Sequence, residues 1–163
     1  MIRLIFLDVD GCLSDGKITY THDGIELKSF NVRDGFAIKT LAKMGYTVAI
    51  ITGRDSTIVE LRAKELDILY LFQGVKDKQA VAEKLCQQLN IRAEEVAAIG
   101  DDLNDYRLLQ WVGMAFIPND ASEYLKPVAQ LLERKGGDAC VREMIEKILI
   151  ANGDEERFLN LWI

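Results

Sequence analysis

The stretch LIFLDVDGCLSDG (residues 4–16) decides the fold, because its apolar run ends in two aspartates, Asp8 and Asp10, followed at once by Gly11. A nearly unbroken apolar run of this length is typical of a strand covered on both faces. Two like charges at the end of such a strand repel each other unless a cation lies between them. The stretch therefore predicts a buried strand that leads into a cation-binding loop.

Similar apolar runs recur along the chain, and most of them are separated by segments with helical spacing. The runs cover residues 2–7, 46–52, 68–73, 96–100, 113–117 and 128–132. Phe36, Ile38, Leu41 and Met44 illustrate the helical spacing. Strands that alternate with amphipathic helices indicate an α/β fold, a doubly wound parallel sheet with helices on both faces.

One segment, residues 17–30, breaks this alternation. It holds two short strand-like runs around Asp23-Gly24, a dipeptide typical of tight hairpin turns. We expect a β-hairpin that projects near the Asp8/Asp10 loop. No other large insert follows that loop, so we expect no cap domain. The chain is predicted to form a single domain over residues 1–163, with a C-terminal tail at 151–163.

Composition narrows the class of protein. The chain has 163 residues and a net charge of −6, from 20 basic and 26 acidic side chains, which argues against broad binding to nucleic acid or anionic membranes. No signal peptide or membrane-length apolar run is apparent. The 3 cysteines are odd in number and lack CxxC spacing, which disfavours a disulfide framework or a thiolate zinc site. We expect a cytoplasmic protein without nucleic-acid or membrane partners.

Polar residues follow four consecutive predicted strands. They are Asp8 and Asp10, then Thr52 with Gly53 and Arg54, then Lys78 within residues 73–78, then Asp101 within residues 100–105. The carboxyl ends of parallel strands share one edge of a sheet, where ligands bind. Carboxylates are ligands that Mg²⁺ prefers, and a metal near Lys78 and a threonine hydroxyl suits phosphoryl transfer.

The same stretches resemble a known superfamily. DVDG (8–11), ITG (51–53), Lys78 and GDDLND (100–105) are similar to the four ordered motifs of the haloacid dehalogenase superfamily. Within it, the chain resembles the capless family of phosphatases that act on 3-deoxy-D-manno-octulosonate 8-phosphate. The stretches that carry this narrower resemblance are DGCLSDG (10–16), NVRDG (31–35), ITGR (51–54), GVKDK (74–78), GDDLND (100–105) and GGDACVRE (136–143).

The resemblance implies a role for each matched residue. Asp8 would be the nucleophile, and Asp10 would protonate the leaving group and then activate water. Asp8, the backbone carbonyl of Asp10, and Asp101 would hold Mg²⁺. Thr52 and Lys78 would hold the phosphoryl oxygens.

Two further sets of residues follow from the resemblance. Asp105 would orient Lys78 or a metal-bound water, and Asp102 is a weaker candidate for the same role. The second set would bind the sugar acid. Its arginines offer a planar fork that suits a carboxylate, and the alternative interpretation of each arginine is a solvated surface charge. The implied substrate-binding set is Asn31, Val32, Arg33, Asp34, Gly35, Lys39, Gly53, Arg54, Arg62 and Lys78.

The implied activity is Mg²⁺-dependent release of phosphate from 3-deoxy-D-manno-octulosonate 8-phosphate through an aspartyl-phosphate, in lipopolysaccharide biosynthesis. One alternative is a phosphatase of a nine-carbon sugar acid 9-phosphate. A remote alternative is a receiver-type phosphorylation switch, but receivers carry their phosphorylated aspartate after the third strand, where this chain has QGVKDK (73–78). The resemblance also implies a homotetramer whose neighbouring subunits close each site.

Two residues depart from the family pattern. Cys12 stands where relatives carry valine or a similar residue, and we interpret it as core filler. Ala139 stands where relatives tend to carry glycine, which would tolerate a positive φ better. The single histidine, His22, is interpreted as a turn residue.

Overall fold

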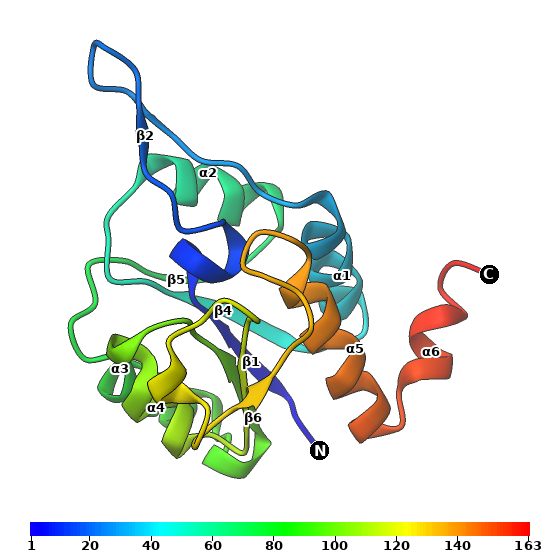
Figure 1. Cartoon of the computed structure of the whole chain (residues 1–163). Helices are drawn as coiled ribbons and strands as arrows, with labels where there is room; N and C mark the ends of the chain where they lie inside the picture. The colour runs from blue at the N-terminus through cyan, green and yellow to red at the C-terminus, as the bar shows by residue number, and fades with distance from the viewer.

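The computed structural model describes all residues, 1–163, and places six parallel strands in one sheet with the order β5-β4-β1-β6-β7-β8 (Figure 1). The strands are β1 (Leu4–Leu7), β4 (Thr47–Ile51), β5 (Tyr70–Phe72), β6 (Val96–Ile99), β7 (Met114–Ile117) and β8 (Gln130–Leu131). Each paired strand runs parallel to its neighbour. The predicted doubly wound sheet is confirmed, and every predicted strand is present but shorter than its apolar run.

Helices cover both faces of the sheet, as the sequence predicted. Packed on one face are α1 (Val32–Lys43), α2 (Thr57–Glu65) and α5 (Cys140–Asn152), and on the other α3 (Lys78–Leu89) and α4 (Tyr106–Trp111). Short turns are η2 (Ala93–Glu95), η3 (Leu103–Asp105) and η4 (Glu123–Leu125). Ile5 and Leu7 of β1 join the α1/α5 core, while Leu4 and Phe6 join the α3/α4 core. Each face of a strand is therefore buried, which explains the unbroken apolar runs.

The position of β1 sets the location of the site. The chain runs outward from β1 through β4 to β5, and then returns to place β6 on the other side of β1. Leu7 of β1 therefore lies opposite both Ile50 and Ile99. Ligands bind at such a switch point, beyond the carboxyl ends of the strands. The loops after β1 and β6 meet there.

A tight turn, η1 (Val9–Leu13), follows β1 and is held from behind by a second loop. Gly11 adopts a φ of 93°, which favours glycine. A Cβ on Gly136 would lie 1.9 Å from the carbonyl oxygen of Gly11, and the amide of Gly137 donates to the carbonyl of Cys12. The backbones thus touch directly. Ala139, the N-cap of α5, has a φ of 63°. This is the positive φ that glycine would tolerate better, as the sequence comparison with the family suggested.

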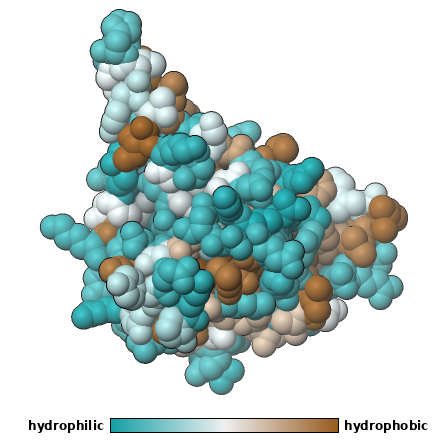
Figure 2. All heavy atoms as spheres, viewed as in Figure 1, coloured by the Kyte–Doolittle hydropathy of each residue, from teal (hydrophilic) through white to brown (hydrophobic).

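The predicted hairpin is confirmed as β2 (Thr19–Tyr20) and β3 (Glu26–Leu27), an antiparallel pair that projects from the body of the molecule (Figure 1). Its strands are short, and a turn closed between Thr21 and Ile25 joins them. Figure 2 shows apolar surface on this projection. Its large apolar side chains are 43 to 59% exposed, and they are Ile18, Tyr20, Ile25 and Leu27.

The C-terminal segment packs on its own chain. α5 continues through Asn152, which corrects the predicted tail boundary at residue 151. The helix is held there because the Asn152 side chain bonds both backbone polar groups of Ile2. After it, α6 (Glu155–Leu159) buries Phe158, and the Trp162 ring lies 4.6 Å from that of Phe36. None of the helices has the length and apolar character that a membrane crossing requires.

The contact between Gly136 and η1 gives a stability prediction. Gly136→Ala should destabilise the fold by about 3 kcal/mol, because overpacking against backbone cannot relax by a rotamer change. Gly153→Ala is the control, since its Cβ would meet no atom within 4 Å and would cost only the strain of a positive φ, about 1 kcal/mol. Urea unfolding of both variants checks this. Equal losses would contradict the packing argument.

Candidate active site

Lys78 is the centre of the polar cluster at the sheet edge. It is the first residue of α3, and its Nζ lies 2.7 Å from Oδ1 of Asp8 and 2.6 Å from Oδ1 of Asp105. Burial lowers the pKa of Lys78, but the charges of the two aspartates outweigh burial and raise it above the usual value. The lysine therefore stays protonated and bridges two loops that are distant in sequence.

One lysine does not balance the acidic side chains around it. Burial raises the pKa of Asp8, and repulsion from Asp105 and Asp101 adds to this, while Lys78 opposes it. Burial, with Asp105 and Asp102 nearby, raises the pKa of Asp101 to about 6. The site thus holds an excess of buried negative charge, which a divalent cation would offset.

The donor set fits Mg²⁺. Ligand atoms of Asp8, Asp101 and Cys12 lie within 4.8 Å of one another. The Cys12 thiol is buried, and burial followed by repulsion from Asp8 raises its pKa well above the usual value, so it stays a neutral, soft group that Mg²⁺ does not favour. Gly11 allows the Asp101 carboxylate to approach, since a Cβ there would lie 2.0 Å from Oδ2. Asp8 and Asp101 would therefore hold the metal.

The two supporting aspartates have different surroundings. Asp105 uses Oδ1 to pair with Lys78, and its Oδ2 accepts from the amide of Asp101. Asp105 therefore orients the lysine and the loop after β6 together. Asp102 precedes η3 as its N-cap, and its carboxylate accepts from the amide of Leu103.

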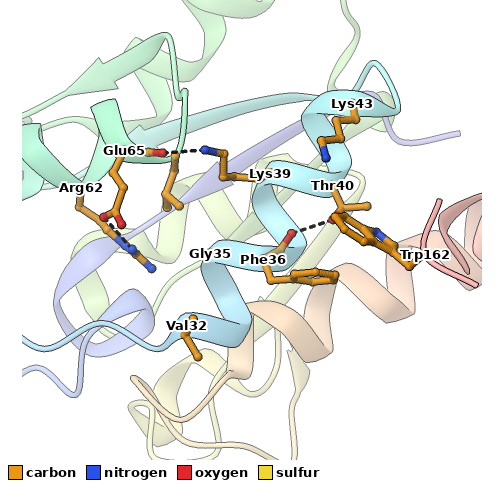
Figure 3. A pocket seen from close by; sticks show the side chains of 10 residues that line it. Val32, Gly35, Phe36, Lys39, Thr40, Lys43, Arg62, Glu65 and Trp162 are labelled. Carbon is orange, nitrogen blue, oxygen red and sulfur yellow. Dashed lines mark hydrogen bonds and ion pairs between the residues drawn. The ribbon is translucent and has the colours of Figure 1, made fainter.

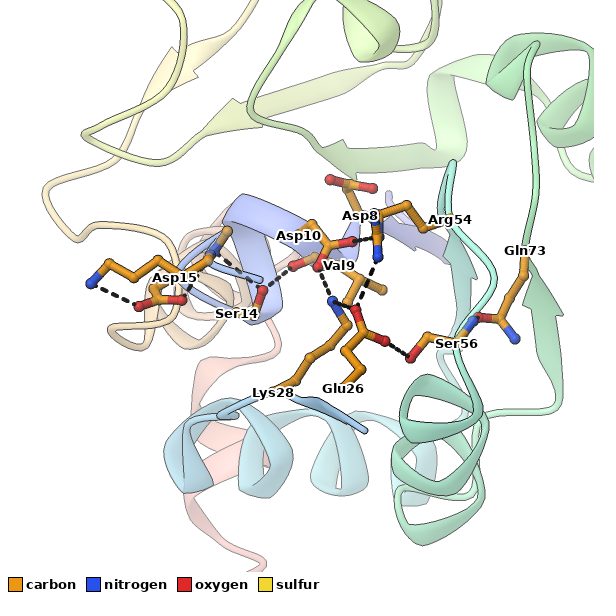
Figure 4. A network of polar contacts seen from close by, with 12 residues as sticks. Asp8, Val9, Asp10, Ser14, Asp15, Glu26, Lys28, Arg54, Ser56 and Gln73 are labelled. Atoms are coloured by element: carbon orange, nitrogen blue, oxygen red, sulfur yellow. Dashed lines mark hydrogen bonds and ion pairs between the residues drawn. The ribbon is translucent and has the colours of Figure 1, made fainter. Parts of the chain in front are cut away.

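Asp10 belongs to a second polar cluster, drawn in Figure 4. Its Oδ1 lies 2.5 Å from Nζ of Lys28, and Arg54 lies 3.9 Å from its Oδ2. Glu26 joins the cluster by pairing with Lys28 at 3.2 Å and Arg54 at 3.1 Å, and by accepting from Ser56. With its carboxylate engaged here, Asp10 has its backbone carbonyl left for a metal.

Sequence analysis missed Glu26, Lys28 and Ser56. Glu26 and Lys28 are two residues apart, so an extended chain turns both side chains to the same face. Since the hairpin directly follows the Asp10 loop, that spacing was the available signal.

The remaining motif residues at the sheet edge lie beside these clusters. Thr52 is buried at the end of β4, and its carbonyl accepts from the amide of Val75, which joins it to the loop before Lys78. A Cβ on Gly53 would lie 3.9 Å from Nδ2 of Asn104 in the loop after β6. The loops after β4, β5 and β6 thus approach one another.

The NVRDG stretch (31–35) lies partly inside the fold. Asn31 caps α1 by accepting from the amide of Arg33, and it donates to the carbonyl of Gly137. Asp34 is 1% exposed, and its Oδ1 accepts from the amide of Arg142 in α5. We therefore correct the expectation that Asp34 contacts a sugar acid, because its carboxylate is turned inward. Val32 is 80% exposed.

Lys39 and Arg62 line a cavity of about 310 Å³ between α1, α2 and Trp162, together with Gly35 (Figure 3). Arg62 donates to the carbonyl of Asn31 and pairs with Glu65. Lys39 donates to the carbonyl of Glu65 at the C-terminal end of α2. Neither cation joins the Lys78 or Asp10 cluster in this chain, whereas Arg54 does.

Comparison with known proteins agrees with this geometry. A model of the haloacid dehalogenase-like hydrolase family matches residues 30–113. The 3-deoxy-D-manno-octulosonate 8-phosphate phosphatase of Yersinia pestis is 45% identical over 151 residues, which are 92% of this chain and 81% of that protein. The chain belongs to the haloacid dehalogenase-like hydrolase family. The phosphatase of the same description from Escherichia coli (strain K12) is 44% identical and covers 93% of this chain and 81% of its own length.

Solved structures of family members have the same fold. A 3-deoxy-D-manno-octulosonate 8-phosphate phosphatase from Moraxella catarrhalis, in complex with a magnesium ion, a phosphate ion and KDO, has a TM-score of 0.95 and 38% identity, and covers 99% of this chain and 94% of that one. The cobalt-bound form of the phosphatase from Haemophilus influenzae has a TM-score of 0.89 and 38% identity, with coverages of 94% and 91%. Membership in this hydrolase family decides against the receiver alternative.

The burial of Asp34 gives a pH prediction. Burial raises the pKa of Asp34 to about 6, above the ordinary aspartate value of about 3.9, so its favourable contribution to stability is complete below pH 4 and is lost as the pH rises through 6. Asp34→Asn keeps the acceptor for Arg142 and removes the buried charge. At pH 7.5 its free energy of unfolding, measured with urea, should exceed that of the parent by about 3 kcal/mol, whereas at pH 4 the two proteins should be nearly equally stable. A loss of stability at pH 7.5 would refute this account.

Proposed function

We propose that the chain is a phosphatase that hydrolyses 3-deoxy-D-manno-octulosonate 8-phosphate to inorganic phosphate and the free sugar acid. The observation that carries the proposal is Lys78, held between Asp8 and Asp105 beside a donor set for Mg²⁺. Relatives of that description, 44 and 45% identical over most of the chain, support the substrate class.

The chain's residues divide the reaction between two clusters. A carboxylate of Asp8 attacks phosphorus, the bond to the sugar oxygen breaks, and Asp10 donates a proton to that oxygen. Asp10 then takes a proton from the water that hydrolyses the aspartyl-phosphate. Lys78 and Thr52 offset charge on the phosphoryl oxygens. Mg²⁺, held by Asp8, Asp101 and the backbone carbonyl of Asp10, would neutralise the charge repulsion between nucleophile and phosphate.

Recognition of the sugar acid belongs to groups beyond the phosphate. The Arg54 side chain is 42% exposed at the rim of the Asp10 cluster, where its planar fork suits a carboxylate. A nine-carbon sugar acid 9-phosphate carries the same two anionic groups, so it is the competing substrate. The eight-carbon substrate is favoured by the descriptions of the relatives. The product would then enter lipopolysaccharide biosynthesis. A cytoplasmic location fits this role, because the buried free cysteines would stay reduced there.

The same proposal includes a homotetramer. The exposed apolar side chains of the hairpin lack a covering surface in the single chain, and a lone hairpin is only marginally stable in water. Hairpins from several copies would bury these side chains in a closed assembly, with neighbouring subunits excluding water from each site. The C-terminal tail would reach a neighbour only by leaving its contact with Phe36.

The substrate is tested by phosphate release from a panel that holds the eight-carbon and nine-carbon sugar acid phosphates and simple hexose phosphates. We expect the highest kcat/KM for the eight-carbon substrate, and no turnover of any substrate by Asp8→Asn, since an amide is a poor nucleophile. Equal rates across the panel would refute the assignment of the substrate. Turnover by the Asp8 variant would refute the mechanism.

The assembly is tested by light scattering. The unmodified chain should have the mass of four copies, and the double variant Ile18→Glu with Tyr20→Glu should have a lower mass and lower activity. Lys17→Glu is the control, because this neighbouring side chain is 82% exposed and already charged. A fully active monomer of the unmodified chain would contradict the proposal.

A further inference from the structure

Lys28 is a buried cation on an otherwise exposed hairpin. Its side chain is 0% exposed, although the preceding residue Leu27 is 50% exposed and Ile25 is 58% exposed. An ammonium group taken out of water costs free energy unless it is paired and hydrogen-bonded. Its partners therefore explain why it lies there.

Those partners come from two separate elements, and a third segment fixes one of them (Figure 4). Lys28 Nζ contacts Oδ1 of Asp10 in η1 and Oε1 of Glu26 in β3. Glu26 is fixed in turn by the hydroxyl of Ser56, which precedes α2, and by Arg54. Burial lowers the pKa of Lys28, but Asp10 and Glu26 outweigh it and hold the pKa above the usual value. The ammonium group is thus charged and held in place from two sides.

Lys28 acts on a different group from Lys78. Lys78 is committed to Asp8 and Asp105, whereas the ammonium of Lys28 reaches Oδ1 of Asp10. Oδ2 lies 3.9 Å from Nε of Arg54, which is beyond hydrogen-bond distance. With Oδ1 anchored by Lys28, Oδ2 is therefore the oxygen left to exchange a proton. Proton transfer needs the two heavy atoms within about 2.6–3.2 Å, and a misplacement of about 1 Å costs on the order of 100-fold in rate.

We propose that Lys28 is a positioning residue that anchors Oδ1 of Asp10, so that Oδ2 faces the oxygen to which the proton goes. The inference rests on the proposed phosphatase function. In the first step the proton on Oδ2 moves to the leaving oxygen as its bond to phosphorus breaks, and the carboxylate remains paired with Lys28. In the second step Oδ2 takes a proton from the attacking water. Lys28 itself neither gains nor loses a proton.

The test uses a series of substituted phenyl phosphates, whose leaving groups need less help from an acid as they become better. The value of kcat/KM reports the steps up to transfer of the phosphoryl group to Asp8. It therefore depends on how well Asp10 protonates the leaving group. A plot of log kcat/KM against leaving-group pKa should be steeper for Lys28→Met than for the parent. We expect at least a 10-fold larger loss on the poorest leaving group than on p-nitrophenyl phosphate. The slope is unaffected by the fraction of enzyme that folds, so a merely structural loss would leave it unchanged.

Four further variants complete the test. Lys28→Arg keeps a cation for Asp10 and should restore most of the parent slope. Lys17→Met, on the same hairpin, should leave slope and rate unchanged. In an Asp10→Asn background, which should already have the steep slope, Lys28→Met should add nothing to it.

The outcomes separate this inference from the proposed function. A parent slope in Lys28→Met, or a further steepening in the Asp10→Asn background, would overturn the role of Lys28 while leaving the phosphatase intact. Hydrolysis of phenyl phosphates without hydrolysis of the sugar acid phosphate would overturn the proposed substrate while leaving the role of Lys28 intact.

Discussion

The ion pairs of Lys78 with Asp8 and Asp105 are the constraint on which the site depends. Three buried charges at 2.6 and 2.7 Å join the end of β1, the start of α3 and the loop after β6. Loss of one member of such a cluster leaves an uncompensated charge, at a cost of about 3–5 kcal/mol. The sheet order makes the cluster possible, because the switch point beside β1 brings the first and fourth polar loops together.

Around this cluster the fold separates two tasks. The Lys78 cluster lies at the sheet edge, where nucleophile, metal ligands and phosphate would meet. The second cluster is centred on Asp10, two residues after Asp8 in the chain. Glu26 and Lys28, at the base of the hairpin, complete it. The backbone contact of Gly136 with Gly11 supports η1 from behind, so the turn that carries Asp10 is held from both sides. The base of the hairpin therefore contacts Asp10, while the apolar side chains Tyr20 and Ile25 stay exposed.

Sequence reasoning reached the parts of this arrangement that local pattern determines. Doubly buried strands have unbroken apolar runs, so the parallel sheet was predictable, and so was the meeting of Asp8, Lys78 and Asp101 at its edge. The hairpin was predictable from Asp23-Gly24. Strand ends were not, because pairing with neighbours decides where a ladder stops, and β5 keeps only residues 70–72 of its apolar run.

Side-chain direction in tertiary contacts was beyond the sequence. Asp34 lies in a stretch matched to substrate recognition, yet its carboxylate turns toward α5, more than 100 residues away in sequence. Lys28 was not singled out from the sequence, because only the orientation of the folded hairpin places it against Asp10. The tail boundary failed for a similar reason, since the bonds of Asn152 to Ile2 extend α5 past the predicted end.

The central claim is that Asp8, held by Lys78, becomes phosphorylated during turnover. Rapid quenching of the enzyme during turnover with borohydride reduces an aspartyl-phosphate to homoserine, which peptide mass spectrometry locates. The account predicts homoserine at position 8 and nowhere else, formed only when substrate is present. Homoserine at Asp10 or Asp101, or none in an enzyme that is turning over under conditions where hydrolysis of the intermediate is slow, would contradict it.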